Sequence, residues 1–578
     1  MILDFKKIFS NMKFNPLSQC LKKNERHVLL FLILTLSLTM FIGGNRGIIS
    51  PNTISKSSKL QATNADQYDL FFTTYLGGNN TDNSLSSAVD DSGNIYVAGD
   101  TLSPDLPMLN SWNSTLNSNS GDAFLAKFDP NGKLLYSTYL GGSKTDRIDS
   151  VAVDGNQNVY VAGFTNSLDF PTKNAYQPSN KAGSYNGFLA KFDSNGKLIF
   201  STYIGGTGID EAQAIAVNSS GYCYVTGQTG SQDFILKNPW NKTYGGNTDN
   251  FIAEYSPTGE LLFSSFFGGN NYDTVKSITL DSNNNFFITG ETSSTTLPVT
   301  SDAYQKTFSG TTDIYISEFN STGFLQYSTY LGTDSENHVN SIAVDSNDSF
   351  YITGYTYSSN FPITTNAYSK ALATSADAIV SEFNSSGHLT YSSYLGGNSD
   401  DFGTGIQVTN KGEIFISGYT DSSDFPVTSG SFNTSYSSNT DCFITKFKTD
   451  PSTLDYSTYF GGSSFDACVG IALDNSENII FAGNTNSNNL LMKDNSYYPN
   501  YSGSGDVFLV KLTNLLAPSQ PNTTQSSTPS QSSNTVTTSS SASVQNTELL
   551  SNPIVAGISG FAVVSLIVNI LLVVKRKK

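Results

Sequence analysis

Short apolar runs, separated by Asn, Asp and Gly, recur along most of the chain. One segment shows the pattern in residues 150–154, 159–163, 187–192 and 198–204, which are rich in β-branched and aromatic side chains. Asp-Gly-Asn-Gln-Asn joins the first two runs, and Asp-Ser-Asn-Gly-Lys joins the last two. Such turns supply the positive φ angles of tight hairpins. The pattern therefore predicts four antiparallel strands in this segment.

A motif of the form [YF]-[ST]-[ST]-[YF]-[LIF]-G-[GT] divides the chain into segments of 63 to 65 residues. Its fourth residue is Tyr75, Tyr139, Tyr203, Phe266, Tyr330, Tyr394 and Tyr459. Four strands in each of seven repeats indicate the blades of a β-propeller. A row of tandem small β-domains is the alternative, and it is disfavoured because one repeat alone has no closed core.

The two ends of the repeat region settle the number of blades. The fourth type of strand first occurs at residues 70–76, ahead of every other strand, and the last repeat stops after its third strand. We expect the N-terminal strand to complete the last blade, which closes the ring and leaves no open edge. The predicted fold is all-β: a seven-bladed β-propeller of four-stranded antiparallel blades over residues 69–514, with flanking membrane helices.

The repeats also share a longer pattern. It reads Tyr-Leu-Gly-Gly with Asp146, then Ala-Val-Asp with Val-Tyr-Val-Ala-Gly, Asp-Phe-Pro at 169–171, and Asp-Ala-Phe-Leu-Ala-Lys-Phe at 122–128. This pattern resembles the SBBP family of β-propeller repeats and covers about residues 69–514. The resemblance implies a surface or secreted propeller and no particular reaction. Thr333, Asn337 and Thr409 depart from the pattern locally.

Two sets of residues recur once per repeat in the longer connections, which all lie on one face of the predicted disc. One set is aromatic and is a candidate ligand-binding ring, with packing between blades as the favoured alternative: Trp112, Tyr176, Trp240, Tyr304, Tyr368, Phe432 and Tyr497. The other set is acidic and follows the repeated Tyr by seven residues: Asp82, Asp146, Asp210, Asp273, Asp401 and Asp466. This ring is a speculative Ca²⁺ site, although capping of the loop backbone is the favoured role.

Charge and composition restrict the partners. The formal net charge is −17, and Arg147 is the only arginine among the repeats. An acidic chain without an arginine cluster is not expected to bind nucleic acid. Among the four cysteines, Cys223, Cys442 and Cys468 occupy non-equivalent positions in the repeats. Buried thiols are the favoured interpretation, and a Cys442–Cys468 disulfide between neighbouring repeats is the alternative.

Both flanks of the repeats have the character of membrane segments. Residues 1–27 are basic, residues 28–49 resemble a signal peptide or signal anchor, and residues 50–68 form a linker. Whether the first segment is cleaved stays open. Residues 553–574 form an apolar run long enough to span a bilayer, and the basic tail at 575–578 places that end in the cytoplasm.

Residues 515–552 are rich in Ser and Thr and are expected to form a disordered stalk. Because the basic tail at 575–578 places the C-terminal end in the cytoplasm, we expect the repeats to lie outside the cell. Candidate N-glycosylation sites are Asn113, Asn241, Asn320, Asn384 and Asn433.

The sequence carries no established catalytic motif. His388 lies in a hairpin turn, which leaves His338, placed in a long loop, as the one candidate catalytic imidazole of the repeats. A pair of carboxylates remains an alternative, and Glu211 and Glu336 are acids that most other repeats lack. We expect no catalytic residue, no cofactor and no enzymatic activity.

The expected function is binding of an extracellular protein or glycan by a membrane-anchored, glycosylated cell-surface propeller, as in adhesion. A structural component of the cell envelope is the first alternative, and a glycan-cleaving enzyme is the second. The layout is typical of archaeal or bacterial surface proteins.

Overall fold

The computed structural model describes residues 67–516, apart from residues 182, 184, 374 and 438. This part of the chain forms 28 β-strands and no helix. Accordingly, none of the described residues belongs to a helix with the length and apolar character of a membrane span. The predicted signal segment, the predicted stalk from residue 517 onward and the predicted transmembrane helix lie outside the described residues.

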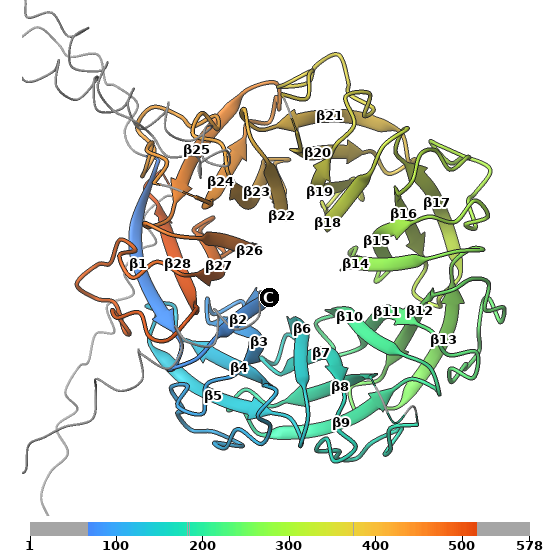
Figure 1. Ribbon diagram of the computed structural model, residues 1–578. Coiled ribbons are helices and arrows are strands. Elements are labelled where there is room, and N and C mark those ends of the chain that lie inside the picture. The colour runs from blue at the N-terminus through green and yellow to red at the C-terminus, as the bar shows by residue number, and fades with distance from the viewer. Residues whose placement is uncertain (1–66, 182, 184, 374, 438, 517–578) are drawn as a thin grey trace, which may run out of the picture. The chain divides into compact units, whose positions relative to one another are not determined.

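Seven four-stranded antiparallel sheets are arranged in a ring as the blades of a propeller (Figure 1). From the centre of the ring outward, we call the strands of each blade inner, second, third and outer. Blade 1 contains β2 (Asp82–Val89), β3 (Ile95–Thr101), β4 (Asp122–Phe128) and β5 (Leu134–Leu140), and blade 2 contains β6 (Asp146–Val153), β7 (Val159–Thr165), β8 (Asn186–Phe192) and β9 (Leu198–Ile204). Blade 3 contains β10 (Asp210–Val217), β11 (Cys223–Thr229), β12 (Asp249–Tyr255) and β13 (Leu261–Phe267), and blade 4 contains β14 (Asp273–Leu280), β15 (Phe286–Thr292), β16 (Asp313–Phe319) and β17 (Leu325–Leu331). Blade 5 contains β18 (Asn337–Val344), β19 (Phe350–Thr356), β20 (Asp377–Phe383) and β21 (Leu389–Leu395), and blade 6 contains β22 (Asp401–Val408), β23 (Ile414–Thr420), β24 (Asp441–Phe447) and β25 (Leu454–Phe460).

Blade 7 joins the two ends of the described chain. Its strands are β26 (Asp466–Leu473), β27 (Ile479–Thr485), β28 (Asp506–Asn514) and β1 (Tyr68–Leu76). The N-terminal strand β1 pairs antiparallel with β28, from Tyr68 opposite Asn514 to Leu76 opposite Val507. The predicted closure of the ring and the predicted count of seven blades are confirmed.

The inner strands begin earlier than the apolar runs predict. Strand β6 starts at Asp146, whereas the apolar run starts at residue 150. The added residues alternate between buried and partly exposed positions, and the register shifts between Ile148 and Ser150. This shift is a β-bulge that leaves Asp149 out of the pairing. All seven inner strands carry the bulge at the equivalent place.

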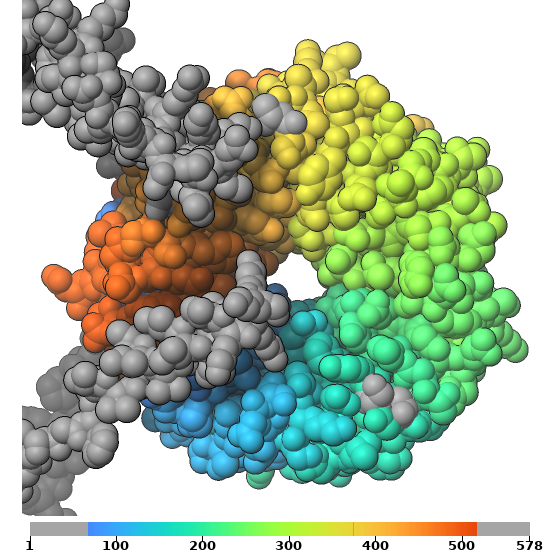
Figure 2. All heavy atoms as spheres, viewed as in Figure 1, coloured from blue at the N-terminus to red at the C-terminus, as the bar shows by residue number. Residues whose placement is uncertain are grey.

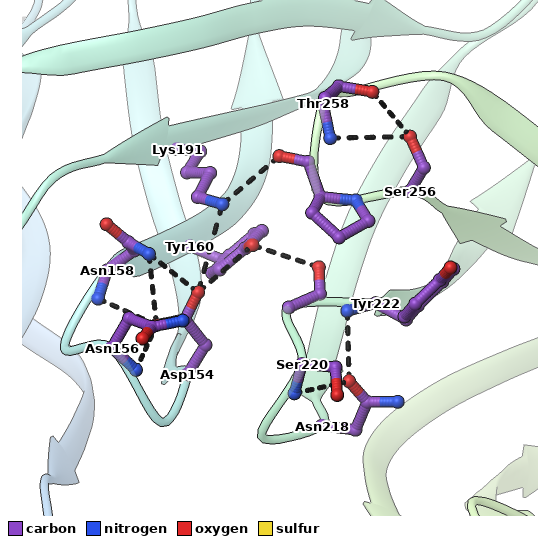
Figure 3. Close-up of polar contacts among 12 residues, drawn as sticks. Asp154, Asn156, Asn158, Tyr160, Lys191, Asn218, Ser220, Tyr222, Ser256 and Thr258 are labelled. Atoms are coloured by element: carbon purple, nitrogen blue, oxygen red, sulfur yellow. Dashed lines mark hydrogen bonds and ion pairs between the residues drawn. The ribbon is translucent and has the colours of Figure 1, made fainter.

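The short hairpins of neighbouring blades contact one another on one face of the ring. Asp154 Oδ1 accepts the backbone N–H groups of Asn156 and Asn158, each at 2.9 Å, which fixes the turn after β6 (Figure 3). Tyr160 Oη donates to the carbonyl of Gly221 in the next blade at 2.9 Å, and Lys191 Nζ donates to that of Pro257 at 3.1 Å. Repeated polar residues therefore connect blade to blade as well as forming turns.

The long connections between second and third strands fold back along the rim. Lys173 and Ser201 form a β-bridge, and Tyr203 N donates to the carbonyl of Gln177 at 3.1 Å. Tyr139 N donates in the same way to the carbonyl of Asn113 at 3.0 Å. The connections thus cover the edges of the outer strands, which would otherwise expose unpaired backbone groups.

The cysteine prediction was wrong for one pair. Cys442, on β24 of blade 6, forms a disulfide with Cys468, on β26 of blade 7, and their Cα atoms lie 5.2 Å apart. The two positions are not equivalent within the repeat, but the junction between blades brings them together. Cys223 is a buried free thiol, as expected.

Candidate functional site

The inner strands line a channel at the centre of the ring, and the opening is visible in the space-filling view (Figure 2). Its walls are largely polar, with Ser86, Ser150, Ser277 and Ser341 at equivalent positions. These serine hydroxyls accept backbone N–H groups of the next blade, as Ser86 Oγ does from Val151 N at 3.2 Å. The channel wall therefore belongs to the packing between blades.

The channel widens at its mouth on the face of the long connections into a hollow of about 450 Å³. The bulged residue of every inner strand lines it, and we call this set the bulge ring: Leu85, Asp149, Gln213, Lys276, Asn340, Thr404 and Val469. Bulges turn a side chain out of the ladder and are common beside functional sites. Every blade presents a different residue type here, although the surrounding backbone repeats.

One side of the mouth is aromatic and extends over blades 5, 6 and 7. The ring centroids of His338 and Tyr355 lie 4.4 Å apart, those of Tyr355 and Phe402 4.6 Å, and those of Phe402 and Tyr419 4.8 Å. Phe465 continues the series at 6.5 Å from Tyr419 and is 40% exposed. We call these five residues the aromatic wall. Tyr355 and Tyr419 belong to the lining of the hollow.

The other side of the mouth is charged and lies on blades 1 to 3. Arg147 Nε lies 2.7 Å from Asp149 Oδ1, and the guanidinium group lies 4.5 Å from the Phe164 ring centroid. Burial raises the pKa of Asp149 to about 7, against the opposing effect of Arg147, and Glu211 and Asp100 raise it further. A carboxyl group that gains and loses its proton near neutral pH therefore faces the mouth.

His338 lies on a strand rather than in the long loop that the sequence predicted. It is the second residue of β18, with Nδ1 3.0 Å from Glu291 Oε1 and Nε2 3.7 Å from Glu336 Oε2. The other acid singled out from the sequence, Glu211, occupies the equivalent position on β10, and its Oε2 accepts Gln228 Nε2 at 2.8 Å. Residues that differ from one repeat to the next therefore lie around the mouth.

The predicted aromatic ring lies on the rim, where four of its members pack against an aromatic residue of the next blade. Trp112 lies 6.3 Å from Phe192, Tyr304 5.8 Å from Phe383, and Tyr368 6.1 Å from Phe447, measured between ring centroids. Phe432, Trp240 and Tyr368 are partly buried, whereas Trp112, Tyr176, Tyr304 and Tyr497 are 37% to 44% exposed. These contacts favour the packing role, and ligand binding by the ring stays a prediction.

The predicted acidic ring forms the first residues of the inner strands, and its carboxylates are bound by nearby donors. Asp82 Oδ2 accepts Gly78 N at 2.7 Å and Ser103 Oγ at 2.9 Å, and Oδ1 accepts Thr101 Oγ1. Within residues 67–516 and outside the gaps noted above, no group of three or more His, Cys, Asp or Glu side chains is placed to hold a metal ion. The geometry fits capping, and Ca²⁺ binding stays a prediction.

The candidate glycosylation sites lie in turns. Asn113, Asn241 and Asn433 belong to the long connections, and Asn320 and Asn384 to the hairpins between third and outer strands. Each side-chain Oδ1 accepts a backbone N–H two residues ahead, at 2.9 to 3.0 Å. Modification of these asparagines stays a prediction.

A family model described as the SBBP β-propeller repeat matches residues 72–107, 135–171, 199–235, 263–298 and 326–362. Each match runs from an outer strand through the inner and second strands of the next blade. Blades 6 and 7 have the same strand order beyond the matched segments.

Two curated proteins share part of the sequence. Regulatory protein FlaEY of Caulobacter vibrioides is 27% identical over 165 residues, which are 28% of this chain and 17% of that protein. The WD repeat-containing protein L264 of Acanthamoeba polyphaga mimivirus is 26% identical over 190 residues, 28% of this chain and 14% of that protein. The matches thus span less than a fifth of either relative.

Solved propellers are more distant. The WD40 domain of Doa1 has a TM-score of 0.40 at 11% identity, covering 77% of this chain and 97% of that one. A PL25 ulvan lyase bound to a saccharide has a TM-score of 0.42 at 10% identity, covering 71% and 92%. Raptor of Chaetomium thermophilum has 0.40 at 8%, covering 78% and 29%. Structural similarity at TM-scores of 0.40 to 0.42 does not support conclusions about the site.

Proposed function

Because five segments of the chain match the SBBP β-propeller repeat, we propose that the chain is a recognition scaffold that binds a ligand at the channel mouth. The observation that carries the proposal is the bulge ring, where seven equivalent backbone positions present seven different side chains into one hollow. If these positions served only the folding of the blades, we would expect the same residue type to repeat from blade to blade. Ligand sites combine a rigid scaffold with a few polar groups placed individually.

The side chains at the mouth favour a glycan as the ligand. The aromatic wall offers apolar ring edges and faces, which suit the apolar face of a sugar ring. Gln213, Asn340 and Thr404 offer amide and hydroxyl groups for sugar hydroxyls, and Arg147 with Asp149 adds a charged pair. A protein ligand is the other class that such a mixed surface can bind.

We propose that this recognition takes place at the cell surface, as in adhesion. The support comes from the sequence: the apolar segment at 28–49, the stalk at 515–552, and the apolar segment at 553–574 followed by a basic tail. We also propose that the protein is not an enzyme. Cleavage of a glycan is the second candidate, favoured by the raised pKa of Asp149 beside Asp100 and Glu211.

The test compares two aromatic positions on the same full-length protein in detergent. Tyr419→Ala removes part of the aromatic wall, and Trp112→Ala removes a half-exposed aromatic of the rim. Binding to a glycan array, followed by titration of the retained glycan, should weaken at least tenfold for Tyr419→Ala and stay unchanged for Trp112→Ala. A loss confined to Trp112→Ala would move the site to the rim.

Other outcomes separate the alternatives. Retention of a peptide or protein instead of glycans would make the ligand a protein. Retention of the protein itself alone would favour the structural component. Shortening of the retained glycan, abolished by Asp149→Asn, would show the glycan-cleaving enzyme.

A further inference from the structure

Two buried acidic positions meet at every junction between neighbouring blades, away from the proposed binding site. The first residue of a third strand is one member, which we call the third-strand acid: Asp122, Asn186, Asp249, Asp313, Asp377, Asp441 and Asp506. The first residue of the next inner strand is the other, which we call the inner-strand acid: Asp146, Asp210, Asp273, Asn337, Asp401, Asp466 and Asp82. All fourteen side chains are at most 1% exposed.

A repeated glycine allows the two acids to approach each other. A Cβ atom added to Gly141 would lie 2.7 Å from Cγ of Asp122 and 2.8 Å from Oδ2 of Asp146. At Gly268, the added atom would lie 2.9 Å from Oδ1 of Asp249 and equally close to Oδ2 of Asp273. The first glycine of the repeated Gly-Gly pair is therefore required because two carboxyl groups crowd the same point of the backbone.

At four of the five junctions with two aspartates, at least one buried carboxylate oxygen has no hydrogen-bond partner among the described residues. Among the inner-strand acids, Asp82 and Asp466 accept donors at both oxygens, whereas Oδ1 of Asp146 and of Asp401 lacks a partner in the described part of the chain.

The third-strand acid Asp122 accepts Asn117 N at Oδ2, at 2.7 Å. Its Oδ1 has no hydrogen-bond partner among the described residues, and the same holds for Oδ1 of Asp313, Asp377, Asp441 and Asp506. Asp249 differs, because Gly246 N donates to its Oδ1 at 3.1 Å and Gly245 N donates to its Oδ2 at 2.8 Å. A buried carboxylate oxygen without a donor is costly, whereas a protonated one is not.

The chain itself replaces one acid by a neutral amide at two junctions. Asn186 takes the place of a third-strand acid, and Asn337 takes the place of an inner-strand acid. No junction loses both acids. Asparagine has nearly the shape of aspartate but carries no charge, so each of these two junctions has one negative charge fewer. Binding of one proton makes the same change at a junction with two aspartates.

We propose that each of the five junctions with two aspartates binds one proton, shared between its two acids, and that loss of these protons loosens the contacts between blades. The ring is then a set of proton-binding sites whose protons are lost as the pH rises toward neutral. This inference is independent of the proposed binding function.

The electrostatic surroundings support the proposal. Burial, ahead of neighbouring acids, raises the pKa of Asp122, Asp441 and Asp506 to about 7. The same cause raises the pKa of Asp249 and Asp377 to about 6. Burial also raises the pKa of the inner-strand acid at each of these junctions, to about 6 for Asp146 and about 7 for Asp401. The charged groups that face the third-strand acids are all carboxyls: Asp146 and Asp169 for Asp122, Asp273 for Asp249, Asp400 for Asp377, Asp466 for Asp441 and Asp82 for Asp506.

The direction of the pH effect follows from these shifts. A carboxyl group whose pKa is higher in the folded than in the unfolded protein binds its proton more tightly when folded. Its contribution to stability is complete below the unfolded pKa of about 4 and declines as the pH rises. It is lost above the folded pKa, which lies at about 6 to 7 for these residues.

The test measures thermal unfolding of the full-length protein in detergent from pH 5 to pH 8. The midpoint should fall as the pH rises. In a variant with Asn at residues 122, 249, 377, 441 and 506, the residue type that the chain already has at Asn186, the fall should shrink to half or less. Asp122→Asn alone should reduce it by a smaller amount, which keeps the test usable if the fivefold variant does not fold. Asp91→Asn, at an exposed position, is the matched control and should leave the fall unchanged.

Infrared spectroscopy supplies a second readout, because a protonated carboxyl group has its own C=O stretch. The band should be present at pH 6 in the wild type and weakened in the fivefold variant. An unchanged pH dependence and an unchanged band in that variant would overturn the proposal. Suppression of the pH dependence by added Ca²⁺ or Na⁺ would also overturn it, because a cation and not a proton would then occupy the junctions.

Discussion

The blade junctions and the channel mouth use the same repeated backbone in opposite ways. At the junctions, the repeats place aspartate or its amide at both acidic positions of every blade. At the mouth, the bulge ring presents Leu, Asp, Gln, Lys, Asn, Thr and Val at equivalent positions. Residue types that repeat in every blade lie at the contacts between blades. Residue types that vary lie where packing between blades does not restrict the side chain. Substitutions should therefore cost most stability at the repeated positions.

The largest loss of stability is expected on substitution of a glycine in the second strand. A Cβ atom at Gly163 would collide with the carbonyl oxygen of Arg147 on the neighbouring strand, and this glycine recurs in every blade. We expect Gly163→Ala to lower the free energy of unfolding by about 4 kcal/mol or more, measured by urea denaturation. Gly470→Ala is the control, because its Cβ would meet only Ser87 Oγ at 3.8 Å. Equal losses in the two variants would contradict the comparison.

The second-largest loss of stability is expected on removal of the disulfide. Cys442 and Cys468 are 26 residues apart and link blades 6 and 7. Replacing both by Ala should lower the free energy of unfolding by about 3 kcal/mol, because the unfolded chain gains freedom. A reducing agent should lower the melting temperature of the wild type and leave that of the double variant unchanged. No response of the wild type would argue against the bond.

A smaller loss is expected at the repeated tyrosine. Tyr203 Oη donates to the carbonyl of Ser167 at 2.8 Å in a buried position. Tyr203→Phe should cost about 1 to 2 kcal/mol, because a buried carbonyl loses its donor. Tyr357→Phe, which alters a 42% exposed residue near the mouth, is the matched control and should change the unfolding midpoint little. The reverse order would show that the repeated hydrogen bond is dispensable.

The smallest loss of stability is expected at the mouth. Gln213→Ala removes a bulge-ring amide that lines the hollow and does not pair in the ladder. We expect a change in the free energy of unfolding within about 0.5 kcal/mol, together with weaker ligand binding. Calorimetric titration with the ligand from the array gives the second quantity. A large loss of stability would place the bulge ring with the repeated positions.

The fold was predictable because its determinants are local and repeated seven times. The predicted strand at residues 198–204 coincides with β9, whose apolar residues face the blade interfaces. The start of β6 was not predictable from apolar runs, because Asp146, Arg147 and Asp149 are polar residues within a strand. A bulge also breaks the period of two that marks a strand.

The site was less predictable than the fold, because it is formed by several blades together. His338, Tyr355, Phe402 and Tyr419 come from four strands of two blades, and their proximity depends on the angle between blades. The disulfide depends on the same geometry. The available signal was comparison of equivalent positions across the repeats, since the seven residues of the bulge ring differ in every blade.

The closure of the ring has a mechanical consequence. Tyr68 pairs with Asn514 at the same corner of blade 7, so force applied between these two ends would peel β1 from β28 one pair at a time. Force applied between a ligand at the mouth and Asn514 would instead act along β28, which is held between β27 and β1, and would load many hydrogen bonds together. We expect single-molecule pulling to find a lower rupture force in the first geometry. A propeller tethered through β28 is thus suited to resist tension carried by its ligand.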